Sequence, residues 1–215
     1  LVVGLVFLHY DSYPNSQISP FRGIDVHEHQ LATGINSFVL FCFFSVVPLL
    51  SMISGWLFFS FDETQARAAI AARIRKRFTS LYLPLAAWNA VFLVAMLALY
   101  AASPQHPLLD QLNIDFATAG PRKYINAIFA VTAHPIGFQF WFVRDLFVTA
   151  LVSPILWLCL RRAPWPTAGV LGTCWLLEID TEIFFRADVV FFFFLGALVR
   201  RHRVALHVGR DATIV

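Results

Sequence analysis

Three groups of ionisable residues lie inside or beside apolar segments, where charge is expensive and therefore points to function. They are His9 at the end of an apolar N-terminal run, the basic cluster 73–77, and Trp141 with Arg144 and Asp145. A neutral imidazole near a helix end could accept a proton from a hydroxyl at neutral pH. The alternative for His9 is a structural hydrogen bond to a neighbouring helix.

The basic cluster Arg73-Ile74-Arg75-Lys76-Arg77 precedes an apolar run that starts near Ser80. Such a cluster anchors a helix at the cytoplasmic face and meets anionic lipid. It could also hold the phosphates of a nucleotide-like donor, because guanidinium and ammonium groups bind such anions. We expect most of the cluster to anchor the helix and Arg77, one turn from the apolar run, to contact the donor.

Trp141 and Arg144 are three residues apart and therefore share one face of a helix. Arg144 and Asp145 are neighbours in the sequence and need not pair with each other, since each could pair with a partner on another helix. A purely structural buried ion pair is the alternative to a role in a site.

Ser54 and Gly55 lie inside an uncharged stretch at 41–59, where small residues usually allow close packing of helices. His27 and His29 belong to a polar loop without a third or fourth ligand nearby, so they predict a solvated loop and not a metal site. The three cysteines, all within apolar runs, are interpreted as small buried hydrophobes: Cys42, Cys159 and Cys174.

The composition is that of an integral membrane protein. Hydrophobic residues make up 59% of the 215 residues and charged residues 13%, against about 25% in soluble domains. The mean hydropathy is +0.69. The net charge of +3 does not indicate nucleic acid, because the basic residues cluster beside apolar segments.

The apolar segments predict an all-α fold, a polytopic transmembrane helix bundle with about six crossings. They cover roughly 1–10, 36–60, 80–102, 138–160, 166–180 and 187–200. A shorter apolar stretch at 124–133 could form an interfacial helix. If the N-terminus is cytoplasmic, most of the 16 lysines and arginines fall on the cytoplasmic side, as the positive-inside rule requires. Two long loops, about 11–35 and 103–137, then lie outside and could form a substrate surface.

The chain starts at Leu1, and its first apolar run is too short to span a bilayer. We therefore expect residues 1–215 to form a single membrane-embedded domain that is truncated at the N-terminus and also at the C-terminus.

Four short motifs follow one another along the chain. They are 3–9, ending on His9; 43–58, with a Ser-Gly-aromatic end; 76–84, followed by Trp88-Asn89; and 140–147, with Trp-Phe-x-Arg-Asp. Together they resemble the acyltransferase-3 family of polytopic membrane O-acyltransferases. The family's basic motif often reads Arg-x-x-Arg, and this chain has Ser80 in place of the second arginine.

The resemblance implies transfer of an acyl group, expected to be acetyl, from acyl-coenzyme A to a hydroxyl of an extracytoplasmic glycan or lipid-linked sugar. It implies His9 as the catalytic base, Arg77 as the donor contact, and a site framework of Ser54, Trp141, Arg144 and Asp145. The expected partners are these two substrates and the lipid bilayer of a bacterial inner membrane, with no metal and no tightly bound cofactor. The alternatives are a transporter or flippase of glycan or lipid precursors, and a structural membrane subunit.

Overall fold

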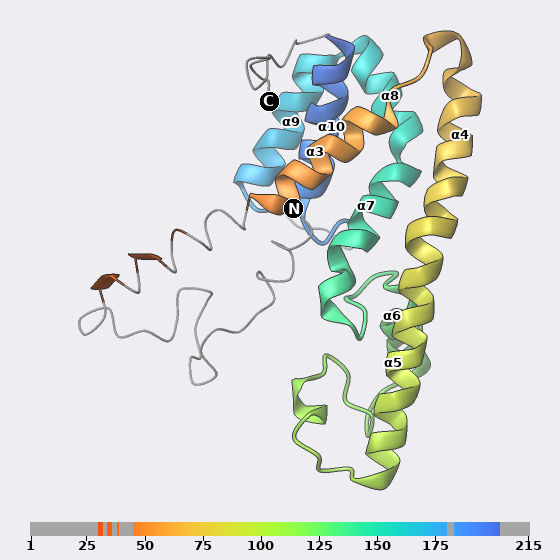
Figure 1. Cartoon of the computed structure of the whole chain (residues 1–215), viewed down its shortest axis with the longest axis vertical. Coiled ribbons are helices and arrows are strands. Elements are labelled where there is room, and N and C mark those ends of the chain that lie inside the picture. The colour runs from red at the N-terminus through yellow and green to blue at the C-terminus, as the bar shows by residue number, and fades with distance from the viewer. Residues whose placement is uncertain (1–29, 32–33, 36–37, 39–44, 180–182, 203–215) are drawn as a thin grey trace, which may run out of the picture.

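The computed structural model describes residues 30–31, 34–35, 38, 45–179 and 183–202 (Figure 1). All regular structure in those ranges is helical, as predicted. The helices are α3 (Val46–Phe58), α4 (Ala66–Arg77), α5 (Leu83–Ala102), α6 (Pro121–Phe129), α7 (Trp141–Leu151), α8 (Ser153–Arg162), α9 (Pro164–Leu176) and α10 (Ala187–Arg201). The predicted base His9 and the loop histidines His27 and His29 lie outside the described residues.

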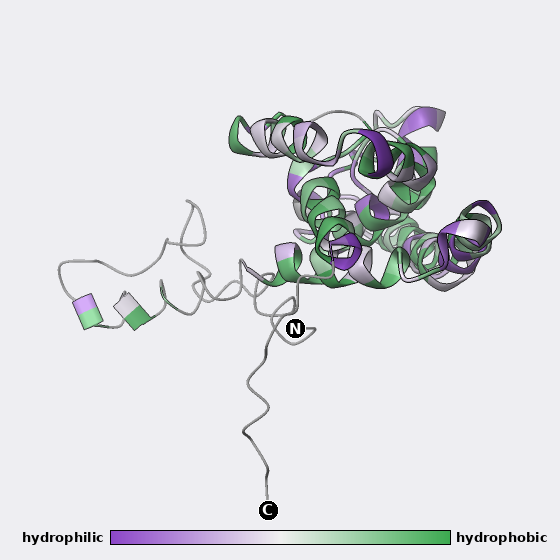
Figure 2. Ribbon diagram, turned by 90° about the horizontal axis from the view of Figure 1, so that it is seen from above, coloured by the Kyte–Doolittle hydropathy of each residue, from purple (hydrophilic) through white to green (hydrophobic). Residues whose placement is uncertain are grey.

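The predicted crossing at 80–102 is the second half of a longer rod. A continuous helix of 40 residues runs over Glu63–Ala102 and contains both α4 and α5. The 20 residues of α5 alone extend about 30 Å, the thickness of a bilayer's hydrocarbon core. The basic helix α4 therefore continues the rod beyond the apolar half. Figure 2 shows the rod end-on at the edge of the helix cluster.

A π-helical turn, Phe78–Tyr82, joins α4 to α5. Its closing hydrogen bond runs from the Leu83 N–H to the Phe78 carbonyl, five residues back. Pro84 follows directly, and in an unbroken α-helix its ring would crowd the Ser80 carbonyl, to which it has no N–H to donate. The wider turn accommodates that carbonyl, and such insertions are frequent at functional sites.

The predicted crossing at 138–160 is two helices. The segments Phe138–Leu151 and Ser153–Arg162 meet at an angle of 59°. The bend falls at Val152, just before Pro154, which cannot donate into the hydrogen-bond ladder. Of the described helices, the α4–α5 rod alone is long and apolar enough to cross a bilayer, and this bent pair would add a second span. Six crossings therefore stay a prediction.

The most extensive helix pairing joins α3 to α10. A Cβ atom added to Gly55 would overlap the carbonyl of Phe193, and one added to Gly196 would overlap the carbonyl of Met52. The two backbones therefore touch where both helices lack a side chain. The structure confirms that Gly55 allows close packing.

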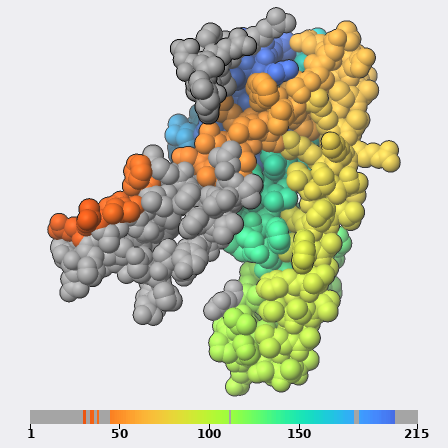
Figure 3. All heavy atoms as spheres, viewed as in Figure 1, coloured from red at the N-terminus to blue at the C-terminus, as the bar shows by residue number. Residues whose placement is uncertain are grey.

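A separate apolar cluster packs α6 and its flanking loops onto α5. Its buried members are Leu93, Ile114, Phe116, Ala127 and Ile136. The helix here begins at Pro121 and ends before Ala130, whose φ of 49° stops it, so it lies a few residues before the predicted 124–133. Figure 3 shows the yellow-green end of α5 and the loop that follows it at one extremity of the molecule, far from the blue α10.

The basic residues gather at the opposite extremity. The C-terminal ends of α8 and α10 and the whole of α4 lie together there (Figure 1). They carry Arg73, Arg77, Arg162, Arg200 and Arg201. This is the arrangement that alternating crossings with a positive inner face require. We refer to this extremity as the basic end and to the extremity where α5 ends as the distal end.

Candidate active site

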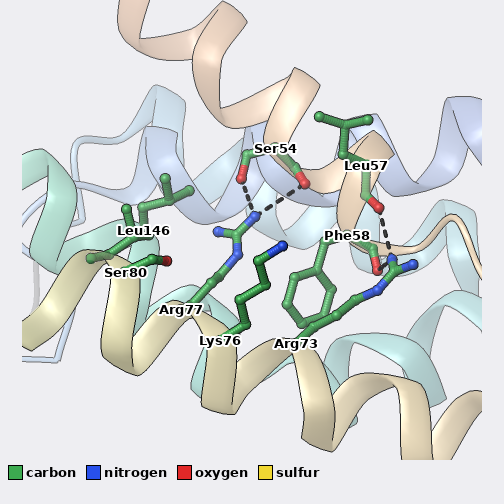
Figure 4. Close-up of a pocket in the computed structure, with 9 residues that line it drawn as sticks. Ser54, Leu57, Phe58, Arg73, Lys76, Arg77, Ser80 and Leu146 are labelled. Carbon is green, nitrogen blue, oxygen red and sulfur yellow. Dashed lines mark hydrogen bonds between the residues drawn. The ribbon is translucent and has the colours of Figure 1, made fainter.

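Arg77 and Ser54, which the sequence singled out separately, are in contact. The Arg77 Nη2 donates to the Ser54 Oγ at 2.5 Å and to the Ser54 carbonyl at 3.4 Å. Its guanidinium carbon also lies 5.0 Å from the ring centre of Phe58 and 5.6 Å from that of Phe193. Figure 4 shows Arg77 reaching from α4 to the end of α3. The serine and the two rings fix the direction of the guanidinium group.

Arg73 lies one turn earlier on α4 and caps α3. Its Nη1 donates to the carbonyls of Leu57, at 2.7 Å, and Phe58, and its Nη2 to the carbonyl of Ser60, at 3.1 Å. Carbonyls at a helix C-terminus lack partners within the helix, and positive charge is favourable there. A basic cluster of this kind predicts a lipid anchor at Arg73, although its spacing of four from Arg77 places both on one helical face.

A cavity of about 350 Å³ lies between these arginines and α3. Its lining residues are Ser54, Leu57, Phe58, Arg73, Lys76, Arg77, Ser80, Leu81 and Leu146. Three of them are cations, and none is acidic. The Nη1 of Arg77 is buried and has no hydrogen-bond partner among the described residues. The cavity therefore offers positive charge to an anionic ligand.

Arg144 forms a second centre and is fully engaged. Its Nε donates to the Ala130 carbonyl at 2.8 Å and its Nη2 to the Val131 carbonyl at 2.6 Å. Its Nη1 donates to the Ile183 carbonyl and pairs with the Asp145 carboxylate at 2.8 Å. Only 3% of Arg144 and none of Asp145 is exposed. The two neighbours do pair with each other, while Arg144 also ties two distant loops together.

Asp145 and Trp141 complete this second centre. The Asp145 carboxylate accepts the backbone N–H of Arg186 at 3.0 Å, and the Arg186 side chain lies 5.1 Å from the ring of the buried Trp141. Arg186 also pairs with the buried Asp188 at 2.7 Å, a contact that the sequence analysis did not foresee. These contacts join α7 to the start of α10. Arg144 and Asp145 thus form a buried ion pair that holds loops and helices together. The role of Trp141, Arg144 and Asp145 as the framework of a site stays a prediction.

Helix α7 connects the two centres without merging them. Leu146 lines the basic cavity, whereas the preceding Arg144 and Asp145 face the loops. Tyr82, in the π-helical turn, stacks on Phe147 with ring centres 4.6 Å apart and donates to the Phe129 carbonyl at 3.0 Å. In the part of the chain that the structure describes, no three His, Cys, Asp or Glu side chains are grouped to hold a metal ion.

These features define a helical protein with a cationic cavity beside an apolar rod. The chain belongs to the acyltransferase-3 family, whose members are membrane proteins: the family described as "Acyltransferase domain" matches residues 1–214. It is also similar to the succinoglycan biosynthesis protein ExoH of Rhizobium meliloti (strain 1021), with 30% identity over 210 residues. The match covers 95% of this chain and 52% of ExoH, so the chain spans about half the length of that relative. No solved structure matches the chain.

Proposed function

We propose that the protein transfers an acyl group, acetyl by expectation, from acyl-coenzyme A to a hydroxyl of an extracytoplasmic glycan or lipid-linked sugar. One observation carries the donor half of this proposal: the cavity lined by the three cations Arg73, Lys76 and Arg77 and by no acidic residue. Coenzyme A is rich in phosphate, and a cluster of cations suits it.

The relative's name supports a glycan acceptor, because ExoH belongs to the biosynthesis of a polysaccharide, succinoglycan. In the proposed topology the N-terminus is cytoplasmic, the chain crosses a bacterial inner membrane about six times, and the basic end faces the cytoplasm. The donor then binds where acyl-coenzyme A is made, and the acceptor approaches from the distal end.

In the proposed reaction, His9 removes the proton from the acceptor hydroxyl. The resulting alkoxide forms a bond to the thioester carbonyl carbon, and the negative charge moves to the carbonyl oxygen. The carbon–sulfur bond then breaks, and coenzyme A leaves as the thiol after it takes the proton from the His9 imidazolium. Arg77 holds the donor, and Ser54 keeps Arg77 in place.

The test uses the full-length protein in proteoliposomes with acetyl-coenzyme A on the basic side. The acceptors are oligosaccharides prepared from succinoglycan and a pool of lipid-linked sugars, and the readout is release of the coenzyme A thiol. We expect acceptor-dependent release that is lost in His9→Ala, reduced in Arg77→Met and unchanged in Arg75→Met, which removes an exposed cation of the same helix.

Two results would contradict the proposal. Unchanged release in His9→Ala, with normal insertion, would remove His9 from the chemistry. Movement of a lipid-linked sugar across the bilayer without any thiol release, for every donor tested, would favour the transporter or flippase.

A further inference from the structure

A second cavity, of about 430 Å³, lies at the distal end. It is formed by the end of α5, the loop that follows and the start of α6. The residues that matter for its chemistry are Tyr100, Asp110, Asn113, Asp115, Phe116 and Lys123. Neither the sequence motifs nor the proposed donor site assigns it a role.

Aromatic rings form one wall of this distal cavity. The rings of Tyr100 and Phe116 lie 5.5 Å apart, and Phe116 in turn stacks on Tyr124 at 6.5 Å. Phe116 is buried and Tyr100 half-buried. The negative face of an aromatic ring attracts the weakly positive C–H groups of a flat, non-aromatic ligand such as a sugar ring.

Exposed hydrogen-bond acceptors and donors surround the aromatic wall. Asp115 is held in one orientation by the Ala117 N–H at 2.9 Å and by the Thr118 hydroxyl at 2.7 Å, and its oxygens keep further lone pairs. Asp110 adds a second carboxylate, and Lys123 adds an ammonium with three donors. The cavity thus offers charged groups of both signs, whereas the charged residues that line the basic cavity are all cations.

The distal cavity rests on a packed scaffold. The Asn113 amide donates to the carbonyls of His134 and Pro135, at 3.1 and 2.9 Å. The Ile136 N–H donates to the Ala127 carbonyl at 2.9 Å, within the apolar cluster that also buries Phe116. A binding site needs such support, because rigid lining residues lose little entropy when a ligand binds.

We infer that the distal cavity is a carbohydrate subsite that holds one sugar ring of the acceptor glycan against Tyr100 and Phe116, with Asp110, Asp115 and Lys123 bonded to its hydroxyls. An aromatic wall beside mixed donors and acceptors matches a neutral pyranose, with an apolar ring face and hydroxyl edges. This inference deepens the proposed function and rests on it for the identity of the glycan.

The sugar held in this subsite is remote from the donor. Tyr100 follows Arg77 by 23 positions on one nearly continuous helix, which corresponds to roughly 35 Å. The thioester reaches away from Arg77 on its pantetheine arm, and we place the ring bound at Tyr100 in a different unit from the one that is acylated. Binding of remote units orients a long chain and raises the efficiency of reaction at its far end.

The first measurement is direct binding, which does not depend on acyl transfer. The protein is placed in nanodiscs free of sugar-headed detergent, and saturation-transfer NMR follows the succinoglycan oligosaccharides. We expect a saturable signal that is weakened at least about threefold in Tyr100→Leu, which keeps the apolar packing, and in Lys123→Met. The control is Arg122→Met, which removes the neighbouring charge on α6 but does not line the cavity.

The second measurement compares acceptor lengths in the thiol-release assay. Tyr100→Leu and Lys123→Met should raise KM for long oligosaccharides and leave KM unchanged for an acceptor of one or two sugar units. Equal effects on short and long acceptors, or unaltered oligosaccharide binding in both variants, would overturn the subsite. The unmodified protein could also bind the oligosaccharides, with weaker binding in Tyr100→Leu and Lys123→Met, and yet release no thiol. That result would contradict the proposed function and leave the subsite standing.

Discussion

The buried Arg144 and the half-buried Arg77 have opposite relations to their surroundings. Arg144 donates to three backbone carbonyls and pairs with Asp145. Arg77 bonds to Ser54 and lines a cavity with two other cations, and its Nη1 has no hydrogen-bond partner among the described residues. An arginine whose donors are all used by the fold stabilises the fold, whereas an arginine that lines a cavity can meet a ligand.

The largest effect is expected where the engaged arginine is removed. In Arg144→Met the Asp145 carboxylate loses its buried partner, and three carbonyls lose a donor. We expect the free energy of unfolding to fall by about 3–5 kcal/mol, measured by thermal or denaturant unfolding in nanodiscs. Arg161→Met removes an exposed arginine and should change stability by less than about 1 kcal/mol. An equally small change in stability in Arg144→Met would show that Arg144 does not stabilise the fold.

The next largest effect is expected at Arg77, which lines the basic cavity. Arg77→Met should raise KM for acetyl-coenzyme A roughly 10- to 100-fold, as expected for the loss of a hydrogen bond to a charged ligand. Its stability should fall less than that of Arg144→Met. Arg77→Lys keeps the charge but not the forked geometry, so an intermediate KM is expected. The comparison fails if Arg77→Met unfolds the protein as severely as Arg144→Met and leaves KM of the folded fraction unaltered.

A smaller effect is expected at Arg73, which both stabilises the fold and lines the cavity. It caps α3 and also lines the basic cavity. Arg73→Met should reduce the free energy of unfolding by about 1 kcal/mol, because three helix-end carbonyls lose a charged donor that solvent partly replaces. Its effect on KM for acetyl-coenzyme A should be smaller than that of Arg77→Met. Hydrogen exchange along α3 reports the first change, and an unaltered exchange rate at its last turn would show that Arg73 is not a cap.

The smallest effect is expected at Asp115, a charged residue that is exposed to solvent. Hydrogen bonds from Thr118 and from the Ala117 N–H lower the pKa of the Asp115 carboxyl below its ordinary value of 3.8. A lowered folded pKa means that the carboxylate stabilises its loop above pH 3.8, and that this contribution is lost as the pH falls through the folded pKa. Because Asp115 is fully exposed, we expect only local loss of amide protection around Ala117 under acid.

Amide exchange of the 112–120 region, corrected for the intrinsic rate, checks this expectation. In Asp115→Asn the protection should be low and independent of pH between about 2 and 5, since the titrating group is gone. A shift in the midpoint of global unfolding in that variant would contradict a purely local role.

Single residues show how far sequence reasoning reached. The apolar segments after residue 45 were predicted as helices, and the close approach at Gly55 is confirmed. Arg77 and Ser54 were chosen for different reasons, the first for its charge beside an apolar run and the second by family resemblance. Only the structure shows that one holds the other. The role of His9, outside the described residues, stays a prediction.

The misses have physical causes. The Arg73 cap was overlooked because a basic cluster is normally a membrane anchor, and nothing in the sequence says which carbonyls it faces. The crossing at 138–160 is bent at Val152, since Pro154 interrupts the ladder of hydrogen bonds. The distal cavity lies in a loop whose residues carry no periodic signal, so its aromatic wall becomes visible only after the loop has packed on α5.

The sequence by itself determined that this chain is a helical membrane protein of the acyltransferase-3 family, because apolar runs, charge placement and short motifs are local properties. The tertiary structure alone decided which arginine has its donors used by the fold and which lines a cavity. That outcome depends on carbonyls from Ala130, Val131 and Ile183, which are distant in the chain and identical in chemistry to every other backbone carbonyl. A backbone acceptor has no sequence signature, so only folding reveals which side chain it satisfies.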